Sequence, residues 1–341
     1  MSQDKPVLGI ESSCDETAAA IVGPDNQVLA SVIHSQISEH ADWGGVVPEI
    51  AGRSHLRMIR PVVEQALQDA DLSPSDLGGI AVTHRPGLLG SLLIGTTAAK
   101  ALAFSWDLPL VGVHHIEAHS YAALMPLEKM EFPYITLVVS GGHTSLYKTT
   151  DALTMELLGS TRDDAAGEAL DKAAKMMDLG YPGGPAIQKA GAEGDPLAFP
   201  FKMPLIAPQS LEFSFSGMKT ALLYTLKGPG GTTADPWIIS RDCVADLCAS
   251  FESVVARTLA RKCRRACEQT GIHRVLVGGG VACNLRLREV MAKEASKAGF
   301  TAQFAPPAYC TDNAVMIAGL GGEKLRRGLV SGLDLDVAST G

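Results

Sequence analysis

The chain opens with short apolar runs separated by polar turns. Val7–Ile10 is apolar apart from one glycine, and it is followed by the polar stretch ESSCDET and a second apolar run, Ala18–Val22. After the turn residues GPDN comes a third run, Val28–His34, which alternates between apolar and polar positions. Short runs of this kind, bounded by turn residues, predict three successive β-strands.

The same pattern returns near the middle of the chain. Ile135–Val139 is an apolar run, Ser140–Thr144 reads SGGHT, and two further short runs follow at Ser145–Thr149 and Met155–Gly159. In both places a small polar turn that ends in threonine separates the first two predicted strands. A recurrence after about half the chain predicts a duplicated domain, because solenoid repeats recur after only ~20–50 residues.

Longer stretches with a helical period surround these strands. The predicted helices are Arg53–Ala70, Leu88–Ala103, Asp242–Gln269 and a last helix that starts near Asp312, and one further strand is predicted at Leu110–Val113. Residues 163–236 are rich in Gly and Pro with helical stretches, which predicts an insertion in the second half. A strand, a glycine turn and a helix follow in HRVLVGGGVACNLRLREVM. We expect the residues after Gly332 to be loosely ordered.

Length and composition favour a cytoplasmic protein of two lobes. The chain has 341 residues, of which 46% are hydrophobic, enough to bury a core in each of two lobes. No apolar run approaches the ~20 residues of a membrane span, and the first residues do not resemble a secretion signal. The 7 cysteines include no CxxC pair, which argues against a disulfide framework or a zinc ribbon. Cys263 and Cys267 are interpreted as packing residues of a helix.

The charge of the chain limits how it could bind nucleic acid. The formal net charge of −8 argues against a protein that coats nucleic acid non-specifically, but it allows local basic patches. Two predicted helices carry such patches, and each patch is either a solvated face or a surface for RNA phosphates. One patch consists of Arg257, Arg261, Lys262, Arg264 and Arg265, and the other of Arg53, Arg57 and Arg60.

The small polar turns are candidates for binding phosphate. Turns rich in Gly, Ser and Thr expose backbone N–H groups to phosphate oxygens, and Gly141 and Gly142 let the backbone approach a ligand closely. One such turn alone is more simply an ordinary hairpin, but two at equivalent places in a duplicated chain favour a nucleotide site. VLVGGGVACN is a third candidate, with Asn284 as a partner for a nucleoside, although glycines also serve tight packing. Asp171 lies either on a solvated helix face or at the border of the same site.

The sequence VHHIEAH has the composition of a metal-binding helix. His115 and His119 are four residues apart and share one helix face, as two ligands of one metal should. In the zinc-protease signature H-E-x-x-H the glutamate directly follows the first ligand, whereas Glu117 lies about 200° around the helix from His115. The protease interpretation therefore fails. A polar helix face whose side chains are hydrogen-bonded within the protein remains an alternative to a metal site.

Asp312, in the sequence YCTDN, is the candidate third ligand. Its simpler role is to cap the last helix, for which Thr311 and Asp312 are both suited, and the sequence alone favours this role. Two imidazoles and one carboxylate would suit iron or zinc and would leave coordination positions open for substrate.

Eight motifs, in order from about Val7 to Gly322, together resemble one family. They are GIESSCDET, HHIEAH, VVSGGHT, DDAAGEALDKAAK, YPGGP, FSFSGMKT, GGGVACN and CTDNAVMIA. The chain resembles the bacterial tRNA N6-adenosine threonylcarbamoyltransferases, once described as O-sialoglycoprotein endopeptidases. The resemblance implies an α/β protein of the actin-like ATPase fold, with two duplicated ribonuclease H-like lobes. We expect residues 1–125 plus 316–341 to form the first lobe, and 126–315 the second, with a mainly helical insertion at about 160–236.

The resemblance also implies a reaction and its partners. The threonylcarbamoyl group would pass from threonylcarbamoyl-AMP to N6 of the adenosine 3′ of the anticodon (position 37), in tRNAs that read codons beginning with A, with release of AMP. The donor is already activated, so the reaction needs placement and charge stabilisation rather than a protein nucleophile. The implied protein partners are an actin-like paralogue and a small P-loop ATPase, and no membrane is involved.

Matched position by position, the resemblance implies roles for individual residues. The metal ligands would be His115, His119 and Asp312. The substrate contacts would be Val138, Val139, Ser140, Gly141, Gly142, Asp171, Gly184 and Asn284. Asp15 and Glu16 would lie near the reacting group, where a carboxylate could accept a proton from the adenine amine. One divalent metal per chain is implied, with iron (Fe²⁺) favoured over zinc, and ATP with Mg²⁺ is a further candidate ligand.

One position departs from the family pattern. Where the family usually reads T-x-G-P-G-L, this chain reads THRPGL, with Arg85 in place of a glycine. Arginine would be strained if the backbone there needs a positive φ, or else it would add a contact for an anionic ligand. The basic, proline-containing C-terminal tail of the family is also absent.

Two other functions are compatible with the same fold. A small-molecule kinase would need a catalytic carboxylate but no histidine-bound metal. A non-catalytic paralogue that only binds its partners would be expected to have lost one of the three candidate ligands, and all three are present.

Overall fold

The computed structural model describes residues 5–204, 207 and 209–340 and divides the chain into two compact units. Unit 1 comprises residues 1–130 and 308–341, and unit 2 comprises residues 131–307. These boundaries differ from the expected ones in one important respect, because Asp312 belongs to unit 1 and not to the second lobe. Residues 205, 206 and 208 of the expected insertion, and residues 1–4 and 341, lie outside the described residues. No helix in the described part is both long and apolar enough to cross a membrane.

Unit 1 is built on a five-stranded sheet with the order β3-β2-β1-β4-β5. The strands are β1 (Val7–Glu11), β2 (Glu16–Val22), β3 (Val28–Ser35), β4 (Gly79–Arg85) and β5 (Leu110–His114). β2 is antiparallel to both of its neighbours, β1 and β3, whereas β4 and β5 run parallel to β1. The carboxyl ends of β1, β4 and β5 therefore meet at one edge of the sheet, where ligands bind in open α/β sheets.

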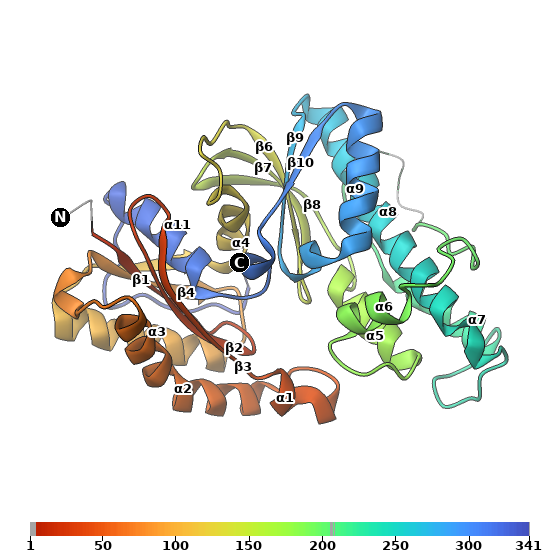
Figure 1. Ribbon diagram of the computed structural model, residues 1–341, viewed down its shortest axis with the longest axis horizontal. Coiled ribbons are helices and arrows are strands. Elements are labelled where there is room, and N and C mark those ends of the chain that lie inside the picture. The colour runs from red at the N-terminus through yellow and green to blue at the C-terminus, as the bar shows by residue number, and fades with distance from the viewer. Residues whose placement is uncertain (1–4, 205–206, 208, 341) are drawn as a thin grey trace. The chain divides into compact units, whose positions relative to one another are not determined.

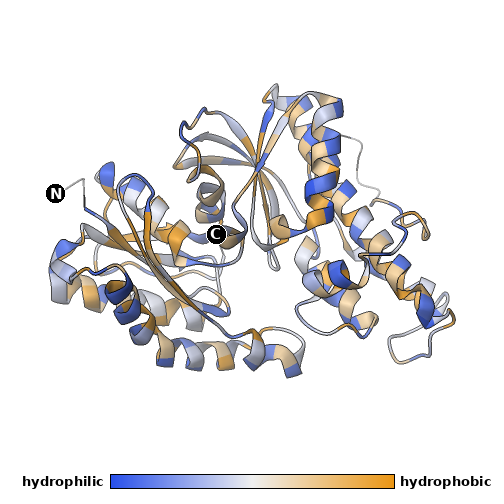
Figure 2. Cartoon of the chain, in the orientation of Figure 1, coloured by the Kyte–Doolittle hydropathy of each residue, from blue (hydrophilic) through white to orange (hydrophobic). Residues whose placement is uncertain are grey.

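Helices cover both faces of this sheet (Figure 1). The helices of unit 1 are α1 (Ile37–His40), α2 (Pro48–Asp69), α3 (Leu89–Trp106), α4 (His115–Leu124) and α11 (Ala314–Arg326), with the 3₁₀ helices η1 (Ala41–Trp43) and η2 (Pro74–Asp76), and α10 (Pro307–Cys310) spans the boundary with unit 2. α2 and α3 lie on one face and α11 on the other. The core between the sheet and helices α2 and α3 includes Leu8 of β1, Ile21 of β2 and Ile59 of α2. Figure 2 shows hydrophobic colours along β1 and β2.

The start of α11 lies directly against β1 at Gly9. A Cβ atom on Gly9 would lie only 2.4 Å from the carbonyl oxygen of Ala314, so any other residue at this position would push the helix away. This close approach brings the residues just before α11 to the carboxyl end of β1. Asp312 lies in that segment.

Unit 2 repeats the strand order of unit 1. Its strands are β6 (Tyr134–Val139), β7 (Thr144–Asp151), β8 (Thr154–Ser160), β9 (Arg274–Gly278) and β10 (Thr301–Phe304). The order β10-β9-β6-β7-β8 has an antiparallel β6-β7-β8 group, followed by β9 and β10 parallel to β6. The two sheets therefore correspond strand by strand, as expected for a duplication.

Two parallel strands, β4 and β10, are not predicted by the hydrophobic pattern. β10 is short and only half-buried, so it gives little periodic signal. The first five residues of β4, GIAVT, are all buried, and such a run has no alternation that would distinguish it from a buried helix.

The helices of unit 2 include the expected insertion. They are α5 (Ala166–Met176), α6 (Gly183–Ala190), α7 (Ser216–Lys227), α8 (Val244–Thr270) and α9 (Leu285–Ala298), with η3 (Arg241–Cys243) and η4 (Gly280–Cys283). α8 packs against β6 and β9, and its Cys263 and Cys267 are buried, which agrees with their interpretation as packing residues.

The two basic patches differ in the structure. On α8, Lys262 is buried and its Nζ donates to the carbonyl oxygen of Ser210 at 2.7 Å, and burial lowers its pKa to about 8. Arg264 pairs with Glu268 and Glu294, both at 2.7 Å. Part of this patch is therefore engaged within the protein, although Arg261 is exposed. On α2, by contrast, the arginines are exposed, and each one pairs with a glutamate: Arg53 with Glu49, Arg57 with Glu39, and Arg60 with Glu64.

One sequence expectation about unit 1 is wrong, and one of the two alternatives considered for Arg85 does not arise. The residues after Gly332 are ordered: Leu335 packs against the core, and the Ala338 N–H donates to the carbonyl oxygen of His84 at 3.1 Å. The tail also covers the open edge of β5, since the Ser331 N–H donates to the Leu110 carbonyl oxygen at 2.7 Å. Arg85 does not have a positive φ, so the strain considered for it does not arise.

Candidate functional site

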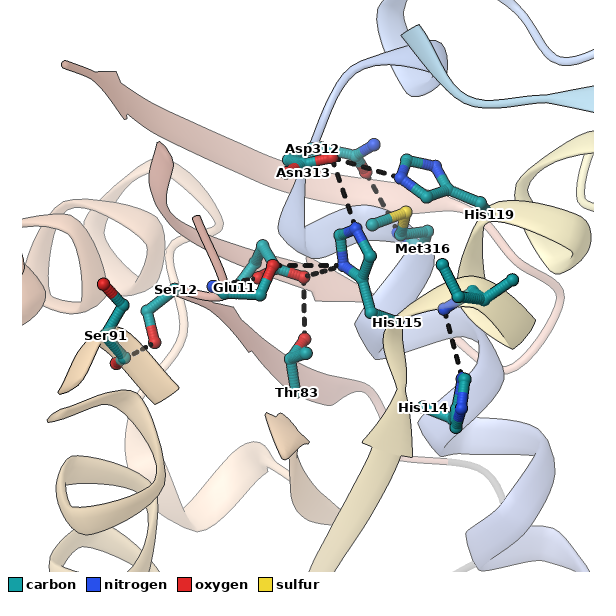
Figure 3. Close-up of polar contacts among 12 residues, drawn as sticks. Glu11, Ser12, Thr83, Ser91, His114, His115, His119, Asp312, Asn313 and Met316 are labelled. Carbon is teal, nitrogen blue, oxygen red and sulfur yellow. Dashed lines mark hydrogen bonds and ion pairs between the residues drawn. The ribbon is translucent and has the colours of Figure 1, made fainter. Parts of the chain in front are cut away.

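Three potential metal ligands converge in unit 1 (Figure 3). The Nε2 atom of His119 lies 3.1 Å from Oδ1 of Asp312, and Nε2 of His115 lies 3.5 Å from the same oxygen. One ligand atom from each residue lies within 4.8 Å of the others. His119 is 0% exposed, His115 6% and Asp312 18%, so the cluster opens mainly on the side of the carboxylate.

The start of α4 fixes the direction of both histidines. β5 ends at His114, whose Nδ1 accepts a hydrogen bond from the Ile116 N–H at 3.2 Å and so caps α4. His115 is then the first residue of the helix, and His119 lies one turn later on the same face. The ring centroids are 4.6 Å apart in an edge-to-face arrangement. The expected sharing of one helix face is thus observed.

The cluster fits a divalent metal ion. Ligand atoms bound to a metal at about 2.1 Å are separated by about 3.0–3.5 Å in tetrahedral or octahedral geometry, and the two distances to Asp312 Oδ1 lie close to this range. Two imidazole nitrogens and one carboxylate oxygen suit borderline metals such as iron and zinc, and they leave coordination positions for a substrate. The group could therefore hold a metal ion of this kind.

The sequence-based preference for Asp312 as a helix cap is wrong. The residue that caps α11 is Asn313, whose Oδ1 accepts from the Met316 N–H at 3.0 Å. Adjacent side chains point in different directions along an extended segment. The Asn313 side chain is therefore directed at the backbone N–H groups of the helix, and the Asp312 side chain at the histidines.

Glu11, which the sequence analysis missed, lies behind His115. It is the last residue of β1, it is fully buried, and its Oε2 is 3.1 Å from Nδ1 of His115. The same oxygen accepts from the Thr83 hydroxyl at 2.7 Å, and Oε1 accepts from the Ser13 N–H at 2.5 Å. The available signal was an acidic residue at the end of an otherwise apolar strand, VLGIE.

The charges of this cluster depend strongly on one another. Burial alone would lower the pKa of His115, but the carboxylates of Asp312 and Glu11 outweigh it and raise this pKa to about 9. Burial would raise the pKa of Glu11, yet His115 and Thr83 hold it below its ordinary value. Burial lowers the pKa of His119. In the metal-free chain both ring nitrogens of His115 are therefore protonated at neutral pH, and metal binding would release one of these protons.

Residues 12–15, which we call turn 1, connect β1 to β2. Turn 1 is held by several hydrogen bonds: Ser12 Oγ donates to the Ser91 carbonyl oxygen at 2.9 Å, and the Leu88 N–H donates to that of Ser13 at 2.8 Å. The Nε2–H of His55 donates to the Cys14 carbonyl oxygen at 3.0 Å. These contacts determine where the two carboxylates that follow, Asp15 and Glu16, can lie.

The pKa of Glu16, which follows turn 1, depends in part on the charge of the candidate ligand Asp312. Burial, followed by the carboxylates of Asp312 and Asp15, raises the pKa of Glu16 to about 10. Glu16 therefore lies close enough to Asp312 and to Asp15 for either carboxylate to disfavour its charged form. At this pKa Glu16 is protonated at neutral pH, so it could accept a proton only where nearby positive charge lowers its pKa.

Residues 140–143, which we call turn 2, connect β6 to β7 in unit 2. The Ser140 N–H donates to the His143 carbonyl oxygen at 2.8 Å, which closes the turn. The carbonyl oxygens of Ser140 and Gly141 accept from the N–H groups of Gly167 and Glu168, both at 3.2 Å, at the start of α5. Gly141 and Gly142 are exposed, and a Cβ atom on either would meet nothing within 4 Å.

The other predicted substrate residues surround the same part of unit 2. Val138 and Val139 are fully buried in β6, so only their backbone could meet a ligand. Asp171 on α5 accepts from the Gly183 N–H at 2.7 Å, next to Gly184 at the start of α6. η4 contacts β6, β9 and α5 and leads to Asn284.

Asn284 is engaged within the protein. Its Oδ1 accepts from the Leu287 N–H at 2.8 Å, which caps α9, and its Nδ2 donates to Glu252 at 2.5 Å. These two bonds fix the direction of the side chain and use one of its two N–H groups and one of its two acceptor positions, so one of each is left for a ligand.

Comparison with known proteins gives consistent results. The family model described as TsaD, tRNA N6-adenosine threonylcarbamoyltransferase, matches residues 27–319. A protein named tRNA N6-adenosine threonylcarbamoyltransferase from Syntrophotalea carbinolica is 48% identical over 333 residues, which cover 98% of this chain and 95% of that one. A protein of the same name from Pelobacter propionicus is 49% identical over 334 residues, covering 98% and 96%.

Solved structures with the same fold are much more distant in sequence. Component A of (R)-2-hydroxyglutaryl-CoA dehydratase from Acidaminococcus fermentans has a TM-score of 0.54 at 13% identity, and the match covers 94% of this chain and 98% of that one. HypF from T. kodakarensis has a TM-score of 0.59 at 16% identity, with 97% of this chain and 49% of HypF covered. At this identity the likeness concerns the fold alone. It agrees with the expected α/β fold of the actin-like ATPase type, which is confirmed.

Proposed function

Because this chain belongs to the tRNA N6-adenosine threonylcarbamoyltransferase family, we propose that it transfers the threonylcarbamoyl group from threonylcarbamoyl-AMP to N6 of adenosine 37 in tRNAs that read codons beginning with A. The observation that carries the proposal is the convergence of His115, His119 and Asp312, with the Glu16 carboxyl group near enough for Asp312 to raise its pKa. A group-transfer reaction needs this combination of charge stabilisation and proton acceptance.

The reaction forms one bond and breaks one bond at the carbamoyl carbon. The N6 amine of adenosine attacks this carbon, the carbon–oxygen bond to the phosphate breaks, and the electron pair leaves with AMP. The amine loses a proton, and we propose Asp15 or Glu16 as its acceptor. The donor is an activated anhydride, so the chain needs no nucleophile of its own.

The proposed cofactor is one divalent metal per chain, iron (Fe²⁺) rather than zinc, held by His115, His119 and Asp312. When bound, such a metal supplies a Lewis acid that stabilises negative charge on carbamoyl and phosphate oxygens. The role of the protein is to place the three ligand atoms and to exclude water, which the burial of both histidines supports.

The contacts with the nucleotide are proposed for unit 2. Turn 2 offers the backbone of two exposed glycines, Gly141 and Gly142, with no side chain to obstruct a phosphate. Asp171, Gly184 and Asn284 surround the same helix start and are proposed to contact the rest of the substrate. ATP with Mg²⁺ is a second candidate ligand for these residues.

The proposal includes partners and a location. tRNA is the acceptor substrate, and an actin-like paralogue and a small P-loop ATPase are the proposed protein partners. The location is cytoplasmic, where the tRNA substrate is. The alternative, a small-molecule kinase of the same fold, has no use for the histidine–aspartate cluster, and the presence of that cluster favours the transferase.

The decisive experiment follows a labelled threonylcarbamoyl group from threonylcarbamoyl-AMP to tRNA. The full chain, loaded with Fe²⁺ and supplemented with the partner proteins, is incubated with an unmodified tRNA that reads a codon beginning with A. We expect label on adenosine 37 and none on the same tRNA with guanosine at that position. Absence of transfer, under conditions in which a known enzyme of the family is active, would reject the proposal.

A further inference from the structure

A buried carboxylate lies on the far side of the His115 ring from Asp312. Figure 3 shows His115 with one ring nitrogen directed at Asp312 and the other at Glu11. The distances are 3.5 Å from Nε2 to Asp312 Oδ1 and 3.1 Å from Nδ1 to Glu11 Oε2. Glu11 itself is not one of the three candidate ligands, because it lies on the Nδ1 side of the His115 ring, whereas Asp312 lies on the Nε2 side.

The other contacts of Glu11 indicate that it acts as an acceptor. The Ser13 N–H can only donate, and it lies 2.5 Å from Oε1. The Thr83 hydroxyl lies 2.7 Å from Oε2 and has its proton available for that oxygen. An ionised carboxylate accepts all such bonds and donates none. Nδ1 of His115 also lies 3.2 Å from the Ser13 hydroxyl, which can either donate or accept. Because the Glu11 carboxylate, at 3.1 Å, can only accept, a neutral His115 beside it carries its proton on Nδ1, and the lone pair of Nε2 is left for a metal.

We propose that Glu11 is a positioning residue of the metal centre, which holds His115 in the tautomer and orientation that metal binding requires. This inference rests on the proposed metal binding by His115, His119 and Asp312. Metal-bound histidines commonly donate their other N–H to a carboxylate, which fixes the ring and makes the ligand nitrogen more basic. β1 supplies Glu11, and the parallel strands β4 and β5 bring Thr83 and His115 to the same edge of the sheet.

The second histidine of the cluster provides an internal contrast. Nδ1 of His119 is buried and has no hydrogen-bond partner among the described residues. No carboxylate therefore supports His119 in the way that Glu11 supports His115. Of the two imidazole ligands, only His115 should depend on a second carboxylate for its tautomer.

The test compares metal affinity in three full-length variants. In Glu11→Gln an amide replaces the carboxylate with nearly the same volume, and an amide N–H directed at Nδ1 would favour the wrong tautomer. In Thr83→Val one donor to Glu11 is lost but the contact with His115 stays. In Glu252→Gln a different buried carboxylate, in unit 2, is neutralised as a matched control.

The readout is the affinity for Co²⁺, measured by competition with a chelator and by the visible absorption of the bound ion. We expect Glu11→Gln to weaken Co²⁺ binding by about 10–100-fold, Thr83→Val by less than about 10-fold, and Glu252→Gln not at all. The melting temperature of each metal-free variant is measured in parallel to show that it is folded. Wild-type affinity in a folded Glu11→Gln variant would overturn the inference while leaving metal binding intact. Failure of the wild-type chain to bind Co²⁺ or Fe²⁺ would overturn both.

A second measurement does not depend on any variant. Nuclear magnetic resonance of the wild-type chain, with ¹⁵N-labelled histidine and bound Zn²⁺, identifies which ring nitrogen of His115 carries the proton. We expect a proton on Nδ1 and the metal on Nε2. A metal-bound Nδ1 would overturn the inference even if Glu11→Gln failed to fold.

Discussion

Turn 1 and turn 2 occupy the same place in two sheets of the same strand order, yet they have different surroundings. Ser12 and Ser13 of turn 1 are buried, and neighbouring helices and loops bind its hydroxyl and carbonyl groups. Gly141 and Gly142 of turn 2 are exposed, and the carbonyl oxygens of Ser140 and Gly141 accept from the start of α5. Turn 1 is thus packed against its surroundings, whereas turn 2 exposes the backbone of two glycines.

One feature is common to both turns. Thr17 follows turn 1, and its Oγ1 donates to His55 Nδ1 on α2 at 2.8 Å. Thr144 follows turn 2, and its Oγ1 accepts from the Ala166 N–H on α5, also at 2.8 Å. In each unit a threonine therefore ties the turn to a helix that follows the third strand. The two units share this frame, and the proposed difference in role, proton acceptance next to turn 1 and phosphate binding at turn 2, rests on the residues within each turn.

The largest effect should come from removing the chemistry that only unit 1 carries. His119→Ala deletes one of three candidate ligands, so we expect bound metal to fall far below one ion per chain and transfer to fall by at least about 10³-fold. Elemental analysis and the tRNA transfer assay measure the two quantities. Gly142→Ala, in turn 2, should keep its full metal content. Stoichiometric metal in His119→Ala would contradict the assignment.

The carboxylates next to turn 1 should give the next largest effect. We expect Asp15→Asn or Glu16→Gln to lower kcat by about 10²-fold, because the proton of the adenine amine loses its acceptor. Metal content should change little, since neither residue belongs to the ligand cluster. Both variants are compared in single-turnover transfer. Near wild-type kcat in both would remove these residues from the proposed mechanism.

A matched pair of glycines tests whether the two turns are equally tightly packed. A Cβ atom on Gly87 would lie 2.6 Å from the Ser13 carbonyl oxygen, and one on Gly167 would lie 2.6 Å from that of Ser140. Both contacts are with backbone, which cannot move away easily. We therefore expect Gly87→Ala and Gly167→Ala each to lower the free energy of unfolding by about 1–3 kcal/mol, measured by denaturant titration. A large effect in only one of them would show that the turns are not equivalent in packing.

The smallest effect on stability is expected at the exposed glycines of turn 2. Gly142→Ala adds a methyl group in open space, so the free energy of unfolding should change by less than about 0.5 kcal/mol. The same methyl group would obstruct the close approach of a phosphate, and we expect the affinity for AMP to fall by about 10-fold. Calorimetry with the full chain checks this. Unchanged AMP affinity would argue that turn 2 does not bind the nucleotide.

Much of the fold and part of the candidate site could be predicted from local sequence. Strands β1–β3 and β6–β8 follow from alternation and turn residues, and their recurrence predicts the duplicated sheet. His115 and His119 follow from a spacing of four on one helix. β4 and β10 did not follow from the pattern, because one lacks alternation and the other is short.

Other parts of the site depend on contacts that no local pattern contains. Asp312 and Asn313 are adjacent and both suited to cap a helix, and the backbone of the segment decides that Asn313 does so. The composition of the tail after Gly332 predicts little order. The tail is nevertheless ordered, because the adjacent Ser331 N–H bonds to the edge strand β5 and Leu335 packs against the core.

By itself, the sequence determined the two groups of strands, the shared face of His115 and His119, and the chemistry that each turn can offer. Only the tertiary structure decided that Glu11 and Asp312, near opposite ends of the chain, would both meet His115. The physical reason is the arrangement of backbone around β1. Parallel pairing brings the carboxyl ends of β1, β4 and β5 to one edge, and the missing side chain of Gly9 lets α11 begin against that same strand.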